Sequence, residues 1–239
     1  MKNTITLLLI LFNLQAFSQK ITYHYDDTLR TPDANDPNRE YIAIYNHKGN
    51  IISQGTLQNG KREGMWRTYA NGNGMLTQVS EYKNGVINGA NIIFGTNGMV
   101  TTDETFKENK LNGTRTTMNN MGRLKTVETY TDGILNGSKK TFYEDGKPQE
   151  EGFWKNGQRD GLTRWYNAKG VVSLEYTYVN GMLQGEAREY NEKGRVQRVG
   201  VYDKNNEQGE WLEFVDDSVL VKKTIFDKGN IVKEIPVKK

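Results

Sequence analysis

The chain of 239 residues contains no cysteine, only two histidines and only four prolines. The absence of cysteine excludes disulfides, thiolate metal sites, a cysteine nucleophile and a lipid-modified N-terminal cysteine. Apolar residues make up 35% of the chain and the mean hydropathy is −0.77, which is poor for a compact core of several layers. The net charge of +3 is too weak to predict nucleic-acid binding. The length fits one or two ordinary domains or one repeat array.

Long hydrophobic runs are also missing, apart from one short stretch at the N-terminus. Lys2 precedes an apolar segment from Ile5 to Phe12, and Ala16-Phe17-Ser18 follows it, which is typical of a secretory signal peptide. The run is shorter than the roughly 20 residues of a membrane-spanning helix. We predict that residues 1–18 are a cleaved signal peptide, and that the mature chain is exported to the periplasm, the outer membrane or the medium. An uncleaved N-terminal anchor is the alternative.

Glycine, in contrast, is abundant at 25 residues, and its positions recur at a fixed period. The second glycine of the segment "WKNGQRDG" (residues 154–161) belongs to a column whose steps are 24 residues after one step of 25: Gly64, Gly89, Gly113, Gly137, Gly161, Gly185 and Gly209. The first glycine belongs to another column: Gly60, Gly85, Asn109, Gly133, Gly157, Gly181, Asn205 and Gly229. A third column runs from Gly49 to Gly194. This regularity indicates a repeat protein.

The substitutions in the first-glycine column distinguish a turn from a phosphate-binding loop. Asparagine replaces glycine at Asn109 and Asn205, and asparagine is the residue that best tolerates the left-handed backbone region after glycine. Asn-Gly and Asp-Gly pairs recur at the same place and are strong hairpin-turn signals. The segment therefore predicts a tight turn at positive φ.

Aromatic and apolar residues occupy further columns of the same period. The first aromatic column is Tyr82, Phe106, Tyr130, Trp154, Tyr178, Tyr202 and Phe226. The second is Tyr45, Tyr69, Phe94, Met118, Phe142, Tyr166, Tyr190 and Phe214, and the apolar column is Ile51, Leu76, Val100, Leu124, Pro148, Val172, Val196 and Leu220. Each unit has room for two strands and two turns. Strict alternation along a strand predicts that the apolar column and the first aromatic column share one face of the sheet.

These columns predict an all-β fold, an elongated antiparallel array of hairpins with about seven full 24-residue repeats and partial capping repeats. Residues 40–239 form this repeat domain. Residues 19–39, rich in Asp, Asn, Thr and Pro, are expected to form an extended N-terminal arm.

With these columns in register, the chain resembles the MORN (membrane occupation and recognition nexus) repeat family, and most closely its bacterial variant. The segments "YKNGVINGANIIFGTNG" from Tyr82 and "WKNGQRDGLTRWYNAKG" from Trp154 carry the resemblance, which covers about residues 41–235. It implies an elongated, grooved antiparallel sheet that binds or scaffolds rather than catalyses. Some bacterial members of the variant family are described as antitoxin-like partners of toxins, but the predicted signal peptide argues against a cytoplasmic antitoxin. The motif positions are structural, so no functional residue is carried over.

The sequence offers no strong catalytic, metal or cofactor site. His24 and His47 are the only histidines, and no nucleophile elbow or paired metal-ligand spacing accompanies them. Aromatic residues outside the two columns are more informative, because the repeat does not require them. We expect some of them to face solvent and to form an interaction surface, with packing near the two ends as the alternative: Trp66, Tyr143, Phe153, Trp165, Tyr176 and Trp211.

Three hypotheses for function follow. The first is an exported, non-enzymatic module that docks an unidentified protein partner or acts as a scaffold at the cell envelope. The second is recognition of envelope glycan or lipid headgroups by the aromatics outside the columns. A hydrolase is the third, and it requires an active site that the regular repeat does not display.

Overall fold

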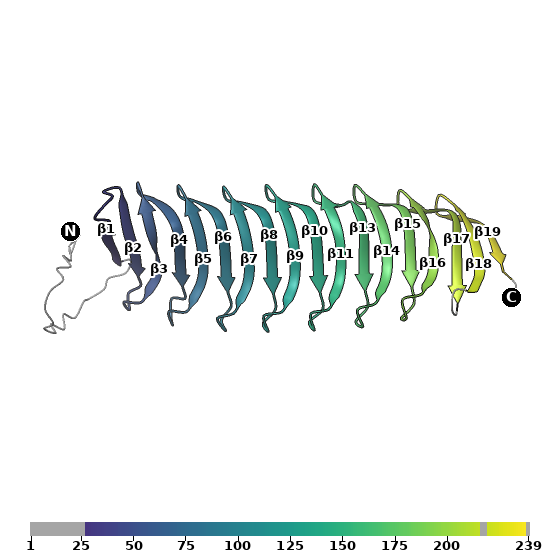
Figure 1. The fold of residues 1–239 in the computed structure, drawn as a ribbon, viewed down its shortest axis with the longest axis horizontal. Coiled ribbons are helices and arrows are strands. Elements are labelled where there is room, and N and C mark those ends of the chain that lie inside the picture. Colours follow the sequence, from purple (N-terminus) through teal and green to yellow (C-terminus); the bar gives the residue numbers. More distant parts are fainter. Residues whose placement is uncertain (1–26, 216–218, 238–239) are drawn as a thin grey trace.

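The computed structural model describes residues 27–215 and 219–237, which form one open sheet of 19 strands without a helix (Figure 1). Each strand pairs antiparallel with its neighbour in the chain, except that β12 and β13 both pair with β11, so that the sheet is one long meander and the predicted all-β hairpin array is confirmed. The strands are β1 (Asp27–Pro32), β2 (Arg39–Tyr45), β3 (Ile51–Gln58), β4 (Lys61–Tyr69), β5 (Leu76–Lys83), β6 (Val86–Phe94), β7 (Val100–Lys107), β8 (Lys110–Met118), β9 (Leu124–Thr131), β10 (Ile134–Phe142), β11 (Pro148–Lys155), β12 (Gln158–Arg159), β13 (Gly161–Tyr166), β14 (Val172–Val179), β15 (Met182–Tyr190), β16 (Val196–Asp203), β17 (Asn206–Val215), β18 (Val219–Asp227) and β19 (Asn230–Pro236).

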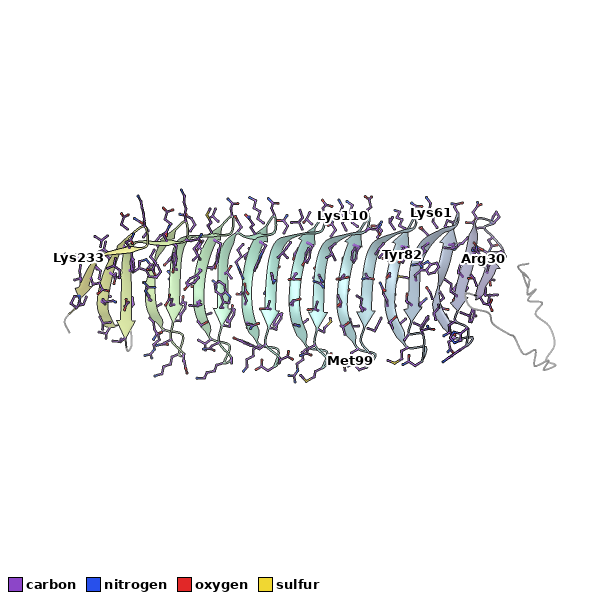
Figure 2. All side chains as sticks on the ribbon, turned by 180° about the vertical axis from the view of Figure 1, so that it is seen from behind. Arg30, Lys61, Tyr82, Met99, Lys110 and Lys233 are labelled. Atoms are coloured by element: carbon purple, nitrogen blue, oxygen red, sulfur yellow. The ribbon has the colours of Figure 1, made fainter. Side chains whose placement is uncertain are left out.

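The tight turns along one long edge of the sheet are those that the Asn-Gly pairs predict. Both central residues have positive φ, as in Asn84 (52°) and Gly85 (86°), which defines a type I′ turn. Asn109 and Asn205 have φ of 63° and 69°, so asparagine replaces glycine at a left-handed position as expected. In Figure 2 the labelled Lys61 and Lys110 lie on this edge and Met99 lies on the opposite edge, where the other set of turns runs.

Hydrogen bonds join the type I′ turns from Asn84-Gly85 onward to the repeat before them. The N–H of Gly85 donates to the carbonyl of Arg62 at 2.9 Å, and that of Gly157 donates to Leu135 at 2.9 Å. Side chains add to this link, since the Glu63 carboxylate accepts from the Asn84 N–H at 2.8 Å. Each turn thus depends on its predecessor, which is the nearest-neighbour coupling of a repeat array.

Two register shifts in every repeat decide which side chains share a face. Beside Gly89, Tyr82 pairs with Ile87 and Ser80 pairs with Asn91. A step of two residues on β5 therefore matches a step of four residues on β6, which leaves two extra residues on β6. At the opposite end, Thr68 pairs with Gln78 and Tyr69 with Leu76, which leaves one extra residue. A shift by one residue moves the residues beyond it to the other face. The predicted common face of the apolar and first aromatic columns is therefore wrong, because strict alternation ignores this bulge.

The two aromatic columns consequently have separate partners. Each residue of the second aromatic column lies directly opposite an apolar-column residue, from Tyr45 and Ile51 to Phe214 and Leu220. Each residue of the first aromatic column lies opposite a glycine of the column that runs from Gly64 to Gly209, as Trp154 lies opposite Gly137. Aromatic and aliphatic cross-strand pairs stabilise a sheet. Every repeat thus contributes one such pair to one face and one aromatic to the other.

Burial distinguishes the two faces. The face of the first aromatic column, here the ladder face, has a centre line of directly opposed residues that runs across the sheet: Gly55, Trp66, Ser80, Asn91, Glu104, Arg115, Glu128, Lys139, Gly152, Thr163, Tyr176, Ala187, Gly200, Trp211 and Thr224. Most buried residues of the described chain lie on this line or beside it. The other face, here the open face, contains the second aromatic column and is more exposed. The ladder face is the core of the rod.

The two ends of the sheet depart from the repeat. Part of the predicted N-terminal arm, residues 27–32, forms β1 and pairs with β2, with Arg30 Nη1 2.6 Å from Glu40. The predicted signal peptide and the start of the arm lie outside the described residues. At the other end, Lys233 takes the place of the second glycine, and β19 pairs with β18 through a one-residue shift instead of the usual two-residue bulge. The two-residue bulge is thus absent from the hairpin that lacks the glycine of the Gly64–Gly209 column.

Candidate interaction surfaces

The C-terminal part of the ladder face is an aromatic cluster. Tyr176, Tyr202, Trp211 and Phe226 make successive edge-to-face contacts with ring centroids 5.9, 5.2 and 6.3 Å apart. Trp211 is fully buried and its indole N–H donates to the carbonyl of Val201 at 3.2 Å. Burial raises the pKa of the Tyr176 hydroxyl, and the Glu189 carboxylate beside it acts in the same direction. Trp211 and Phe226 belong to the core, and the partly buried Tyr176 and Tyr202 pack against it.

An arginine lies over each tryptophan of the chain. Arg198 is 4.1 Å from the ring centroid of Trp211, and Arg62 is 4.3 Å from that of Trp66. Arg159 lies 5.1 Å from Trp154 and 5.7 Å from Trp165. A guanidinium over an aromatic face is attractive and shields the ring from water.

The middle of the ladder face is polar instead. Ser80 Oγ donates to Asn91 at 2.7 Å, and Asn91 Nδ2 donates to Glu104 at 3.0 Å. The line continues through Arg115, whose Nε is 2.9 Å from Glu104 and whose Nη1 is 3.6 Å from Glu128. Lys139 Nζ lies 3.1 Å from the other oxygen of Glu128. Each buried carboxylate is thus partnered by cations or donors across the strands, as a structural ion network requires.

The structure separates the six aromatics that the sequence singles out. Trp66 and Trp211 are 4% and 0% exposed, so these two are core residues near the two ends, in line with the alternative of packing there. Trp165 and Tyr176 are half-buried on the ladder face with centroids 5.7 Å apart. Tyr143 lies in a turn, and its hydroxyl donates to the carbonyl of Tyr166 at 2.6 Å. Phe153 alone is strongly exposed, at 57%, and it lies on the open face.

Two glycines outside the repeat columns explain the buried tryptophans. A methyl group on Gly55 would lie 2.4 Å from the ring of Trp66, and one on Gly200 would lie 2.1 Å from the ring of Trp211. Each tryptophan therefore packs onto a cross-strand glycine that has no side chain to displace it. The sequence contained this signal, because both glycines precede their tryptophan by the same interval.

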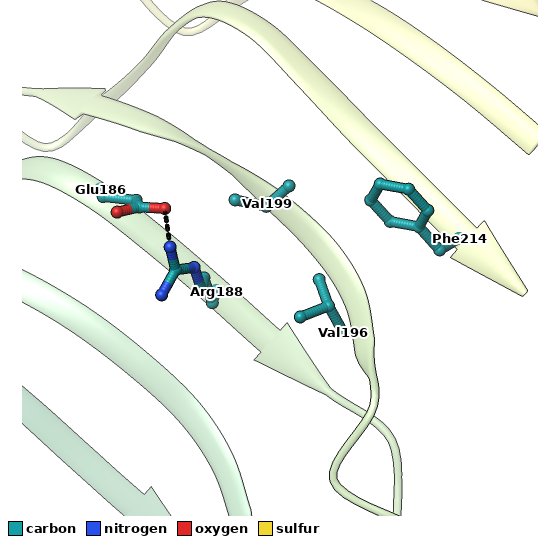
Figure 3. A pocket seen from close by; sticks show the side chains of 5 residues that line it. All are labelled: Glu186, Arg188, Val196, Val199 and Phe214. Atoms are coloured by element: carbon teal, nitrogen blue, oxygen red, sulfur yellow. Dashed lines mark ion pairs between the residues drawn. The ribbon is translucent and has the colours of Figure 1, made fainter. Parts of the chain in front are cut away.

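The open face contains a shallow pocket of about 290 Å³ between β15, β16 and β17. Val196, Val199 and Phe214 form its apolar lining, and Glu186 and Arg188 line one side (Figure 3). Arg188 Nη2 lies 2.6 Å from Glu186 Oε1, which keeps the pair beside the pocket. A pocket of this kind can accept one apolar side chain.

Ion pairs and tyrosine hydroxyls cover the open face between this pocket and β10. The Tyr166 hydroxyl donates to Glu151 at 2.5 Å, and Tyr190 donates to Glu175 at 2.6 Å. Arg164 Nε lies 2.6 Å from Glu175 and its Nη1 lies 3.5 Å from Glu151. The hydrogen bond from Tyr166 lowers the pKa of Glu151, while burial and that same hydrogen bond raise the pKa of Tyr166 to about 12.

Residues 27–215 and 219–237 contain no group of three or more His, Asp or Glu side chains that could hold a metal ion. Over the same ranges, no helix is long and apolar enough to cross a membrane.

The fold and its faces define a class, a single-sheet hairpin array with a 24-residue repeat. Residues 135–156 match the family model of the MORN repeat variant, so the resemblance to MORN repeats is confirmed. No curated protein matches the chain. Among solved structures, a porin-like protein from Bacteroides uniformis is similar over 87% of this chain and 92% of that chain, with 11% identity and a TM-score of 0.19. A TM-score this low carries no argument about fold or function.

Proposed function

We propose that this repeat protein is an exported, non-enzymatic interaction module that docks a protein partner, or acts as a scaffold, at the cell envelope. Its docking surface is the open face from β10 to β17. Export is inferred from the N-terminal 18 residues, and an antitoxin-like role is a special case of the same docking.

The exposed Phe153 is the observation that carries the proposal. The same position in the other repeats holds Thr56, Glu81, Thr105, Thr129, Thr177, Val201 and Ile225. A 57% exposed phenylalanine does not serve the core, and four other repeats have threonine at that place. Exposed aromatics are common anchors of protein interfaces. Val201, 45% exposed, is the equivalent residue two repeats further along, next to the pocket residues Val199 and Glu186.

The surroundings of Phe153 suit a protein partner. The Arg and Glu side chains of the open face pair with one another across strands, so they form a fixed polar rim around the apolar positions. An apolar anchor within a polar rim is the usual anatomy of a protein interface. The surface is long and repetitive, which fits an extended partner segment.

Affinity capture tests this function. The mature chain (residues 19–239) is immobilised and exposed to solubilised envelope proteins, beside a Phe153→Ala/Val201→Ala variant and a matched control, Met65→Ala. Met65 is 43% exposed on the open face of the N-terminal part. The proposal expects one stoichiometric protein that binds the wild type and the control but not the double variant. Equal capture by all three chains, or capture by none, contradicts it.

Glycan binding remains the second candidate because of one observation. Trp165, Tyr176 and Tyr178 are only half-buried on the ladder face, and ring faces of this kind can stack on sugars. Sedimentation with envelope polysaccharide, compared between wild type and Trp165→Ala, tests it. Binding that is unchanged in the variant counts against recognition by these rings.

A further inference from the structure

Four of the type I′ turns contain the same Asn-Gly pair in the same conformation: Asn59-Gly60, Asn84-Gly85, Asn156-Gly157 and Asn180-Gly181. Their asparagines have φ between 49° and 52°, and their glycines have φ between 74° and 86°. All eight residues are exposed. The four turns are therefore matched in sequence, dihedral angles and access to water.

They differ in the partner of the glycine N–H. Gly85, Gly157 and Gly181 donate to carbonyls of the preceding repeat at 2.8 to 2.9 Å. No full repeat precedes the first turn, where the Asn59 N–H instead donates to Asn38 at 2.8 Å. Within the described residues, the N–H of Gly60 has no such acceptor.

The first turn is also uncovered by side chains. A methyl group on Gly85 would lie 3.5 Å from Lys61, and one on Gly181 would lie 3.6 Å from Gln158. A methyl group on Gly60 would meet nothing within 4 Å. Gly60 is thus free of both restraints that its counterparts experience.

We propose that Asn59 is a site of spontaneous modification, deamidation to aspartate and isoaspartate. The backbone nitrogen of Gly60 loses its proton to hydroxide and attacks Cγ of Asn59. A new C–N bond closes a five-membered ring and the bond from Cγ to the side-chain nitrogen breaks. That nitrogen takes a proton from water and leaves as ammonia, which returns the hydroxide and yields the succinimide. Water then opens either carbonyl of the ring and yields an α- or β-linked aspartyl residue. No oxidant or reductant is needed.

The hydrogen bond explains why the other three turns are protected. An N–H that donates to a carbonyl is stabilised in its protonated form, and it cannot move toward the side chain without losing that bond. The net strength of one such bond corresponds to a rate ratio of about 3- to 10-fold. The product places a carboxylate beside Lys61 and, in the β-linked form, an extra backbone carbon in the turn between β3 and β4. The modification therefore acts on the N-terminal end of the rod.

Peptide mapping of the intact mature protein tests the proposal. After incubation in warm, mildly alkaline buffer, tryptic digestion releases residues 49–61, 156–159 and 170–188, which separate Asn59, Asn156 and Asn180. The mass increase on conversion of amide to carboxyl is followed with time. A parallel incubation in concentrated urea removes the fold while keeping the sequence.

We expect Asn59 to react about 3- to 10-fold faster than Asn156 and Asn180 in the folded protein, and all three to react at one rate in urea. Equal rates in the folded protein overturn the proposal. A difference that persists in urea also overturns it, because neighbouring sequence and not the missing hydrogen bond would then be the cause. Asn71-Gly72, in which neither residue has positive φ, lies outside this comparison.

Discussion

The middle and the C-terminal part of the rod share a backbone and differ in their centre line. From β5 to β10 the line is Ser80, Asn91, Glu104, Arg115, Glu128 and Lys139, which is held by hydrogen bonds and ion pairs. From β14 to β18 it includes Tyr176, Ala187, Trp211 and Thr224, and aromatic packing holds it. The same glycine turns and the same two bulges occur in both parts.

This difference shows which positions determine the fold. Glycine turns, bulges and the paired aromatic columns set the register, and the centre line is free to be polar or aromatic. A repeat array needs only compatible neighbours at each step. Because apolar burial contributes more than a partnered polar line of similar size, we expect the aromatic part to be the more stable one.

The largest expected effect is that of Trp211→Ala, which removes a fully buried ring from the aromatic part. The loss of a large buried side chain costs about 3–5 kcal/mol in free energy of unfolding. Urea unfolding followed by fluorescence and circular dichroism measures it. Phe153→Ala, at an exposed position, is the control and should change stability by less than about 0.5 kcal/mol. Equal losses in the two variants would contradict the assignment of the ladder face as core.

Gly200→Ala tests how the tryptophan is seated. The new methyl group would lie 2.1 Å from the Trp211 ring and must displace it, at a cost of about 1–3 kcal/mol. Gly72→Ala is the matched control, since nothing lies within 4 Å of its methyl group and its φ is not positive. Unfolding curves of the two variants should separate clearly. Superimposable curves would mean that Trp211 does not pack on Gly200.

Glu128→Ala probes the polar part. It leaves Arg115 and Lys139 without their shared carboxylate, but both cations are partly exposed. We therefore expect a loss of about 1–2 kcal/mol, below the ~3–5 kcal/mol of a fully buried pair. Replacement of the four charges together (Glu104→Gln, Arg115→Met, Glu128→Leu and Lys139→Met) leaves no buried carboxylate without a cation, and it should restore or exceed wild-type stability in urea unfolding. A further loss in the quadruple variant would show that the fold requires the polar line.

The smallest expected effect is on the pH dependence of stability, which comes from the open face. The pKa of Glu151 is lowered from 4.5, so its contribution is present above that pH and is lost as pH falls through the lower folded value. The pKa of Tyr166 is raised from 10.0 to about 12, so its contribution is lost as pH rises between these values. Tyr166→Phe should flatten both the acid and the alkaline limb of the dependence of stability on pH, which is measured as Tm at each pH. The change in free energy of unfolding should be about 1 kcal/mol or less, because both groups are partly exposed.

Tyr41→Phe is the control for this pH profile. The hydroxyl of Tyr41 donates to the uncharged Gln54 at 2.6 Å, so its loss should leave the acid limb unchanged. A Tyr166→Phe profile with the wild-type shape at both limbs would show that the Tyr166–Glu151 hydrogen bond is not formed in solution.

Much of the fold could be predicted from the sequence because glycine reports backbone conformation directly. The positive φ of Asn109 and Asn205 follows from asparagine in a glycine column. The face on which the apolar column lies could not be predicted from the sequence. It depends on the bulge at Thr77, an extra residue at a position where no particular residue type recurs. Similarly, Trp154 can be recognised as structural because it belongs to an aromatic column. Trp66 and Trp211 belong to no column, and they can be recognised as core residues only from the glycine on the neighbouring strand that each one packs against.

Hydrogen exchange followed by mass spectrometry tests the contrast between the two parts most directly. The free, full-length mature protein is exchanged under native conditions, and peptides from β5–β10 are compared with peptides from β14–β18. We predict that amides of the aromatic part are protected longest and that the polar part opens at lower free energy. Equal protection along the rod, or longer protection in the polar part, would contradict the claim that the aromatic centre line is what stabilises the array.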